Sequence, residues 1–456
     1  MEKETTYDLT CGSIGRKLIC FFLPIAAGTI FQQLYNTVDA MVVGRFVGRE
    51  ALAAVGGSAA QVITLCIGFF VALTGGASAV IAQLMGARME KEVSHAVHSA
   101  LAFSILAGLV LTAAGLPLTP RILEWMRTPA DTMAQSVAYL RVYLSGTVFV
   151  LLFNMGSGIL RAVGDSRHPF YFLAACCLCN IVLDLVFVVG MDLGVAGAAW
   201  ATVLSQLLST VLVLRQLTGV REAYHVSLRE IRIHPQVTAM MLRIGIPSGL
   251  QESMYNAANL ILQVAINSLG TAAVAGWSIT GKLDGIYVAL SSALGVAVMS
   301  MAGQNFGAGK LNRVRQTLRS SMVIFQPMTL AVGIFLLWMG EHGLFLFTDD
   351  PAVMECTRQI LWLLVPFYLV WTVIEGIGGI LRGVGDAVAP VCITCAGVCV
   401  IRLVWVFAVF PRWHTLVGLL SCWPLSWTLT AIAMWMYYRK GRWLQKLRPQ
   451  ESRENL

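Results

Sequence analysis

The fold is decided by one segment that occurs twice, as Gly158-Ile-Leu-Arg-Ala-Val-Gly-Asp-Ser-Arg-His-Pro169 and as Gly379-Ile-Leu-Arg-Gly-Val-Gly-Asp-Ala-Val-Ala-Pro390. The two copies share eight of twelve residues and lie 221 positions apart. At the same spacing, Gln83 corresponds to Gln304. This internal repeat predicts a chain that is built from two related halves.

The composition around the repeat indicates a membrane protein. Hydrophobic residues make up 57% of the 456 residues and charged residues 12%, about half of the roughly 25% that is usual in soluble proteins. So few charges cannot cover a water-soluble surface of this size, whereas a protein surrounded by lipid does not need them. The sequence therefore predicts an all-α integral membrane protein with twelve transmembrane helices in two pseudo-symmetric six-helix lobes. The predicted spans, each long enough for the roughly 20 residues that cross a bilayer, lie near residues 16–41, 52–80, 94–116, 135–157, 169–190, 195–215, 240–267, 273–301, 317–340, 358–380, 389–409 and 416–438.

The basic residues predict the orientation in the membrane. They gather in the even-numbered loops and the tails, while the loop near residues 341–355 on the other side is acidic. Since Lys and Arg accumulate on the cytoplasmic side, we expect a multi-pass protein of the cell membrane with both termini in the cytoplasm, and the net charge of +8 needs no nucleic-acid partner. The predicted division is an N-lobe at 1–217, a cytoplasmic linker at 218–238, a C-lobe at 239–440 and a cytoplasmic tail at 441–456.

Six helices are an even number, so both lobes enter the membrane in the same direction. Two such lobes are related by an axis along the membrane normal, with a cavity expected between them. This plan is typical of alternating-access transporters. With no Ser/His/Asp, phosphate-loop or metal-ligand spacing in the sequence, we expect no enzyme activity and no metal site beyond Na⁺.

Ionisable residues inside membrane spans are costly, so they are the first functional candidates. Asp39 shares one stripe of its predicted helix with Gln32, Tyr35 and Asn36, at spacings of three or four residues. Asn180 and Asp184 are four residues apart on the fifth predicted helix. Carboxylates with carboxamides nearby suit reversible binding of a cation, either H⁺ or Na⁺. The structural alternative is that both acids only hydrogen-bond to neighbouring helices.

The second half does not copy this pattern. Glu375 corresponds to Asn154 of the first half. Glu252 and Asp284, with Lys282, either form an ion pair or line the cavity. An apolar cavity wall is expected from Tyr35, Phe153, Met254 and Tyr255, for which ordinary packing is the alternative interpretation.

The repeated segment itself falls at cytoplasmic turns. Arg161 with Asp165, and Arg382 with Asp386, either cap helix ends or close an inner gate. Turn chemistry is the favoured interpretation.

At this point the chain resembles the multidrug and toxic compound extrusion (MATE) transporters over nearly its whole length. The resemblance rests on the paired Leu-Arg-Gly/Ala-x-Gly-Asp segments and on the early Leu-Pro-Ile followed by Gln-x-x-Tyr-Asn-x-x-Asp, which ends at Asp39. The first-lobe pattern is similar to the DinF-like branch. It differs from the NorM-like branch, where a carboxylate is expected earlier on the tenth helix than Glu375.

The resemblance implies a cation site and a transport function. The positions matching the family's cation site are Asp39, Asn154, Asn180, Asp184 and Thr202. The implied function is secondary active export of amphipathic, often cationic compounds in antiport with H⁺ or Na⁺, by a monomer with no cofactor. The substrate cavity is expected to include Gln32, Tyr35, Asn36, Phe153, Glu252, Met254, Tyr255, Asp284 and Glu375.

The alternative function is a lipid-linked saccharide flippase of the same superfamily. Such a protein tends to need cationic side chains in its cavity for phosphate groups, and the predicted spans contain few. The lipid bilayer and small-molecule drugs are the expected partners.

Overall fold

The computed structural model describes residues 8–441 and Trp443, and within these it contains helices and no strand. Of the predicted tail at 441–456, only Gly441 and Trp443 lie among the described residues. In this part of the chain, ten helical spans are long and apolar enough to cross a membrane, and the bent pair α5–α6 makes an eleventh. The predicted all-α membrane fold is confirmed.

The remaining predicted span, near residues 240–267, is a helix of 33 residues, α9 (Pro235–Asn267). It is not among the apolar spans, because Gln251, Glu252, Asn256 and Asn259 make its central part polar.

The chain divides into two compact units. Unit 1 consists mainly of Cys20–Gly249, and unit 2 of Thr10–Ile19 with the described residues from Leu250 onward. Helices α1 and α9 each contribute to both units. The division at Gly249 lies beyond the linker expected at 218–238, and the lobe boundaries in the membrane stay a prediction.

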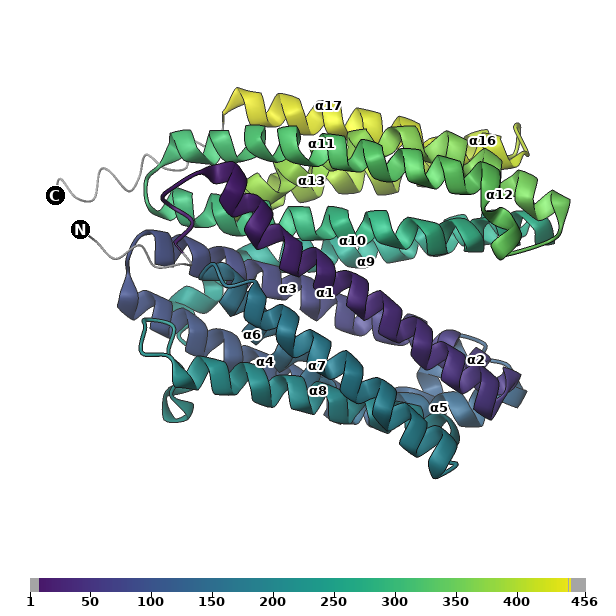
Figure 1. Ribbon diagram of the computed structural model, residues 1–456, viewed down its shortest axis with the longest axis horizontal. Coiled ribbons are helices and arrows are strands. Elements are labelled where there is room, and N and C mark those ends of the chain that lie inside the picture. Colours follow the sequence, from purple (N-terminus) through teal and green to yellow (C-terminus); the bar gives the residue numbers. More distant parts are fainter. Residues whose placement is uncertain (1–7, 442, 444–456) are drawn as a thin grey trace. The chain divides into compact units, whose positions relative to one another are not determined.

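In unit 1, α6 packs against α3, α4 and α8, and α7 lies along α8 (Figure 1). The central position of α6 matters for the site, because residues along one side of this helix line a cavity. The helices of this part are α1 (Ile14–Val42), α2 (Arg49–Gly56), α3 (Ser58–Gly86), α4 (Glu90–Trp125), α5 (Ala130–Ser145), α6 (Thr147–Ala162), α7 (Arg167–Asp184) and α8 (Gly194–Gly219).

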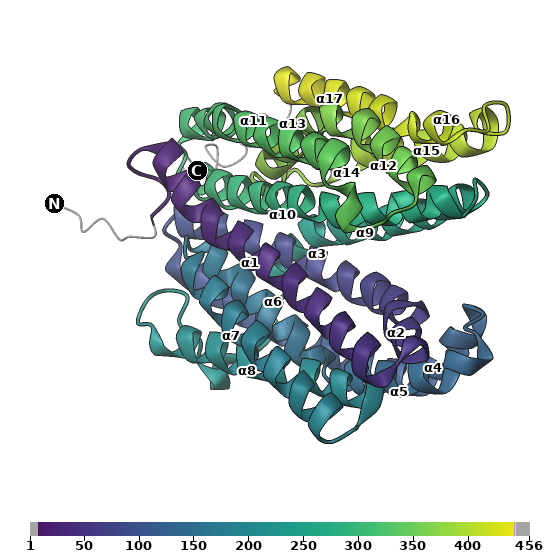
Figure 2. The ribbon, with the colours of Figure 1, turned by 45° about the vertical axis from the view of Figure 1, so that its right-hand side comes forward.

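In unit 2, α13 packs against α10, α11 and α17, which run side by side with it (Figures 1 and 2). By the repeat, α13 is the counterpart of α6. Besides α9, the helices are α10 (Thr271–Gly307), α11 (Leu311–His342), α12 (Pro351–Leu364), α13 (Tyr368–Gly383), α14 (Val388–Thr394), α15 (Ile401–Val404), α16 (Leu416–Leu420) and α17 (Cys422–Lys440).

Glycine allows two close helix contacts. A Cβ on Gly76 of α3 would lie 2.5 Å from the backbone of Gly245 on α9. A Cβ on Gly383, in the second copy of the repeat, would lie 2.5 Å from the carbonyl oxygen of Met299 on α10. Small residues let membrane helices approach this closely, and the packing compensates for the weak hydrophobic driving force between helices in lipid.

Several spans depart from regular α-helix. The fourth predicted span is broken at Gly146, where α5 and α6 meet at 49°. The first and fifth continue as π-helical segments, Val43–Val47 and Leu185–Gly190. Such π-helical turns occur frequently at functional sites, and these two begin directly beyond the helices that carry Asp39 and Asp184.

The connection between the predicted lobes packs against α4 at its first turns. The Nε2 of His98 accepts a hydrogen bond from the backbone N–H of Ser227 at 3.0 Å. The N–H of His234 donates to Ser99 Oγ at 2.9 Å, and the His234 ring stacks on His95 at 4.0 Å between centroids. These histidines therefore hold part of the linker on unit 1.

Candidate functional site

Two carboxyl groups meet inside unit 1. Asp39 of α1 is 9% exposed and Asp184 of α7 is 0% exposed, and the two carboxyl groups are close enough to influence each other electrostatically. Both oxygens of Asp184 and the Oδ1 of Asp39 are buried without a hydrogen-bond donor among the described residues. A buried polar group that lacks a partner costs about 1–3 kcal/mol, so this arrangement is unfavourable unless something else occupies it.

Asn180 extends the same cluster of unpartnered groups. It is 0% exposed, and neither its Oδ1 nor its Nδ2 has a hydrogen-bond partner in the described structure. Since it lies one turn before Asp184 on α7, the two side chains share a face of the helix. The sequence spacing thus produces the predicted proximity of Asn180 and Asp184.

The other two residues of the cation site predicted from the resemblance bond within their own helices. Thr202 of α8 is buried and donates to Ala198 O at 3.1 Å. Asn154 of α6 donates to Val150 O at 2.8 Å. In each case the side-chain oxygen keeps lone pairs that can accept a hydrogen bond or coordinate a cation.

Tyr139 of α5 was not predicted. Its side chain is 6% exposed and close enough to interact electrostatically with both Asp39 and Asp184. The sequence gives little signal for it, since a single tyrosine in a helical run is ordinary packing. The nearby Arg141 gives no signal either, because it is exposed and two residues away along the chain.

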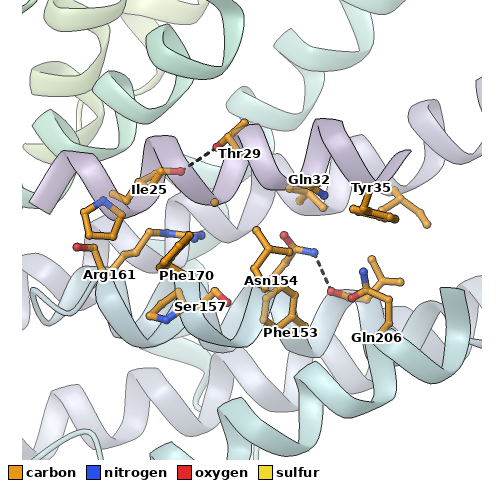
Figure 3. Close-up of a pocket in the computed structure, with 18 of the residues that line it drawn as sticks. Ile25, Thr29, Gln32, Tyr35, Phe153, Asn154, Ser157, Arg161, Phe170 and Gln206 are labelled. Atoms are coloured by element: carbon orange, nitrogen blue, oxygen red, sulfur yellow. Dashed lines mark hydrogen bonds between the residues drawn. The ribbon is translucent and has the colours of Figure 1, made fainter. Parts of the chain in front are cut away.

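A cavity of about 250 Å³ lies within unit 1. Figure 3 shows Arg161 and Ile25 at one end, and Tyr35 and Gln206 at the other. Of the predicted cavity residues, Gln32, Tyr35 and Phe153 line it, as does Asn154. Asn36 is exposed and is not among the lining residues.

One end of this cavity lies near Asp39 in the sequence of α1. Tyr35 lines it, and Asp39 is one helical turn further along the same face of α1. The acids themselves are not among the lining residues, so the cavity ends about one helical turn before Asp39, within the same unit.

The predicted residues of the second half are distributed differently. Tyr255 and Glu375 line a small cavity of about 10 Å³ in unit 2. The Arg382 guanidinium donates to Glu375 Oε2 at 3.3 Å. Met254 is 42% exposed, and Glu252, which is half-buried, interacts with Glu375 electrostatically.

Asp284 accepts a hydrogen bond from the hydroxyl of Tyr368. Among the described residues no ion pair joins it or Glu252 to Lys282, which is exposed. Of the two alternatives for this trio, the ion pair is therefore absent from this structure.

Of the repeated segments, the first shows turn chemistry at Asp165, whereas Arg161 and Arg382 pair with neither aspartate of the repeat among the described residues. Asp165 Oδ1 accepts from the backbone N–H groups of Arg167 and His168, at 3.0 and 3.2 Å, at the start of α7. Its Oδ2 lies 2.5 Å from the ring Nδ1 of His168. Asp386 accepts from the Tyr437 hydroxyl at 2.5 Å.

The chemistry of the carboxyl pair suits a proton or a hard monovalent cation. Carboxylate, amide and hydroxyl oxygens are the available donors, and hard cations prefer oxygen ligands. Within the described residues there is no cluster of three His, Cys, Asp or Glu side chains that would hold a transition metal. The unpartnered oxygens of Asp39, Asn180 and Asp184 fit H⁺ and Na⁺ equally.

Comparison with known proteins gives consistent matches. The family model described as MatE matches residues 24–186 and 247–407, most of the chain and both repeats. The chain is 28% identical over 438 residues to the probable multidrug resistance protein YpnP of Bacillus subtilis (strain 168), covering 96% of this chain and 97% of that protein. It is 25% identical over 417 residues to the probable multidrug resistance protein NorM of Thermotoga maritima, covering 90% and 88%.

The fold is also similar to a solved one. A structure described as the outward-facing conformation of a multidrug resistance MATE family transporter of the MOP superfamily superposes with a TM-score of 0.89 at 24% identity, covering 97% of this chain and 100% of that one. At this identity the match concerns the fold. Together with the family match over both halves, it leads to one conclusion: the chain belongs to the MatE family, the multidrug and toxic compound extrusion transporters.

Proposed function

We propose that this protein exports amphipathic organic compounds across the cell membrane in antiport with H⁺ or Na⁺. The observation that carries the proposal is the buried pair Asp39–Asp184: three of its four oxygens lack a donor among the described residues, and Asp39 lies one helical turn beyond the cavity residue Tyr35. An ion-coupled transporter needs a site that is unfavourable when empty, because binding of the ion must release enough free energy to change the conformation.

In this proposal Asp39 and Asp184 hold the coupling ion, and Asn180 stabilises it with its amide oxygen. Asn154 and Thr202 supply further oxygens from α6 and α8. Binding draws α1 and α7 together at the carboxyl pair, so the wall that Gln32 and Tyr35 give to the cavity changes shape. The membrane potential contributes about 2.3 kcal/mol per unit charge per 100 mV to inward ion movement.

The proposed orientation has both termini in the cytoplasm. Then the carboxyl pair, near the C-terminal ends of α1 and α7, lies toward the outside, where the coupling ion is taken up. The flippase alternative is not favoured, since the relatives reported above are multidrug resistance proteins by name.

The test is ethidium efflux from vesicles with an imposed pH gradient and, separately, an imposed Na⁺ gradient. We expect efflux under one gradient, lost in both Asp39→Asn and Asp184→Asn. Asp192→Asn is the matched control, because Asp192 is an exposed carboxylate in the turn after α7. Full gradient-driven efflux in both of the first two variants would refute the ion-site assignment.

A further inference from the structure

The cavity of unit 1 contains a positive charge that the proposed ion coupling does not use. Arg161, near the C-terminal end of α6, is half-buried and lines this cavity. No carboxylate of the described residues lies within ion-pair distance of it. The nearest acid in sequence, Asp165, is engaged by His168 and by the start of α7.

The second copy of the repeat shows one way in which this arginine can be neutralised. Its counterpart, Arg382, pairs with Glu375 seven residues earlier on α13. The residue seven positions before Arg161 is Asn154, which is neutral and bonds to its own helix. Unit 1 therefore has the same guanidinium without the compensating carboxylate, and here the cavity is about 250 Å³ in place of about 10 Å³.

Two further groups in the cavity lack partners. Ser157 Oγ, one turn before Arg161, and Gln206 Oε1 are buried without a hydrogen bond among the described residues. The rest of the wall includes the apolar side chains of Ile25, Phe153 and Phe170. A hydroxyl and a guanidinium one turn apart, next to apolar walls, form a site for an acidic group on an apolar body.

We propose that Arg161 and Ser157 bind the oxyanion (carboxylate or phosphate) of an amphipathic ligand, so that unit 1 accepts organic anions and zwitterions. This inference rests on the proposed function for its role in transport, and on the cavity alone for binding. The apolar body lies along Phe153 and Phe170. A zwitterion then directs its cationic end toward Gln32 and Gln206, away from Arg161.

Binding is tested with a matched pair of fluorescent probes, dansylglycine and its neutral amide dansylglycinamide, titrated into the purified full-length protein in detergent. A charge-assisted hydrogen bond stabilises by about 1.5–3 kcal/mol, so the acid should bind about tenfold or more tightly than the amide. Arg161→Gln should abolish the difference. Arg161→Lys should keep part of it, because the charge remains while the two-pronged geometry is lost.

Asn154→Glu is the sharper variant, since it leaves Arg161 in place and installs the partner that Arg382 has. It should also abolish the preference for the acid, and it covers the case in which Arg161→Gln fails to fold. Arg141→Gln, at an exposed arginine of α5, should bind both probes as the unaltered protein does. Equal affinity for acid and amide in the unaltered protein, or a preference that survives in Arg161→Gln, would overturn the proposal.

Competition separates the two sources of the oxyanion. If short-chain phosphatidylglycerol displaces dansylglycine and loses this ability in Arg161→Gln, the ligand group is a lipid phosphate. If it does not compete, the site belongs to soluble organic acids. Efflux of cationic ethidium without any acid preference would reject this inference alone, whereas acid preference without gradient-driven efflux would reject the proposed transport function and keep the binding site.

Discussion

Replacing Asp184 by Asn should raise stability while it removes ion coupling. Asp184 is 0% exposed and neither oxygen has a donor among the described residues. A buried unsatisfied group costs about 1–3 kcal/mol. The Asn amide is neutral and can donate to Asp39, so the substitution should recover about that amount. For a unit of this size 1 kcal/mol corresponds to about 2–4 °C in Tm.

The assay is thermal unfolding in detergent at alkaline pH without Na⁺, followed by intrinsic tryptophan fluorescence. Acidification or added Na⁺ should stabilise the unaltered protein by mass action and should stabilise Asp184→Asn much less. Asp192→Asn should match the unaltered protein throughout. A lower Tm for Asp184→Asn under these conditions would refute the reasoning, because it would mean that other groups already satisfy the carboxylate.

Three further outcomes are expected. Gly383→Ala should lower the free energy of unfolding by about 1–3 kcal/mol, because the added Cβ would lie 2.5 Å from the carbonyl oxygen of Met299. Thermal or chemical unfolding measures this loss. The control is Ala162→Gly at the equivalent position of the first repeat, which introduces no clash. Burial, and then the charges of neighbouring His and Arg side chains, lower the pKa of His234. Docking of the linker should therefore be complete above the ordinary His pKa of about 6.5 and should weaken as the pH falls below it. Hydrogen exchange of the linker should rise below that pH in the unaltered protein and not in His234→Gln. Tyr368→Phe removes the hydroxyl that donates to Asp284 and should lower stability by about 1–3 kcal/mol, a result that an unchanged Tm would contradict.

The apolar runs predicted most of the architecture, because the bilayer requires each spanning helix to be about 20 residues long and largely apolar. Helices α7 and α10, for example, begin within two residues of their predicted starts. The break at Gly146 was not predicted, because a single apolar run from 135 to 157 crosses it and a 49° bend leaves no mark in composition. The π-helical segments were not predicted either, because they too leave no mark in composition.

The candidate site was predictable where it contains ionisable side chains inside membrane spans, which are energetically costly. Asp39 and Asp184 were predicted because a buried carboxylate in a membrane span is costly and so points to a function, and in the structure they are close enough to influence each other electrostatically. Tyr139 was missed because its role depends on which helix faces α1, which is tertiary information. Arg161 was assigned to turn chemistry, since only the folded structure shows that a cavity opens beside it.

The π-helical turn after Asp184 has a mechanical consequence. Such a turn holds one residue more than an α-helical turn, and this surplus can pass along a helix without breaking it. Each residue that it passes rotates by about 100°, the angle between successive residues of an α-helix. A shift of the π-helical turn at Leu185–Gly190 by a single position toward the N-terminus would therefore rotate the Asp184 side chain by about 100° around the helix axis.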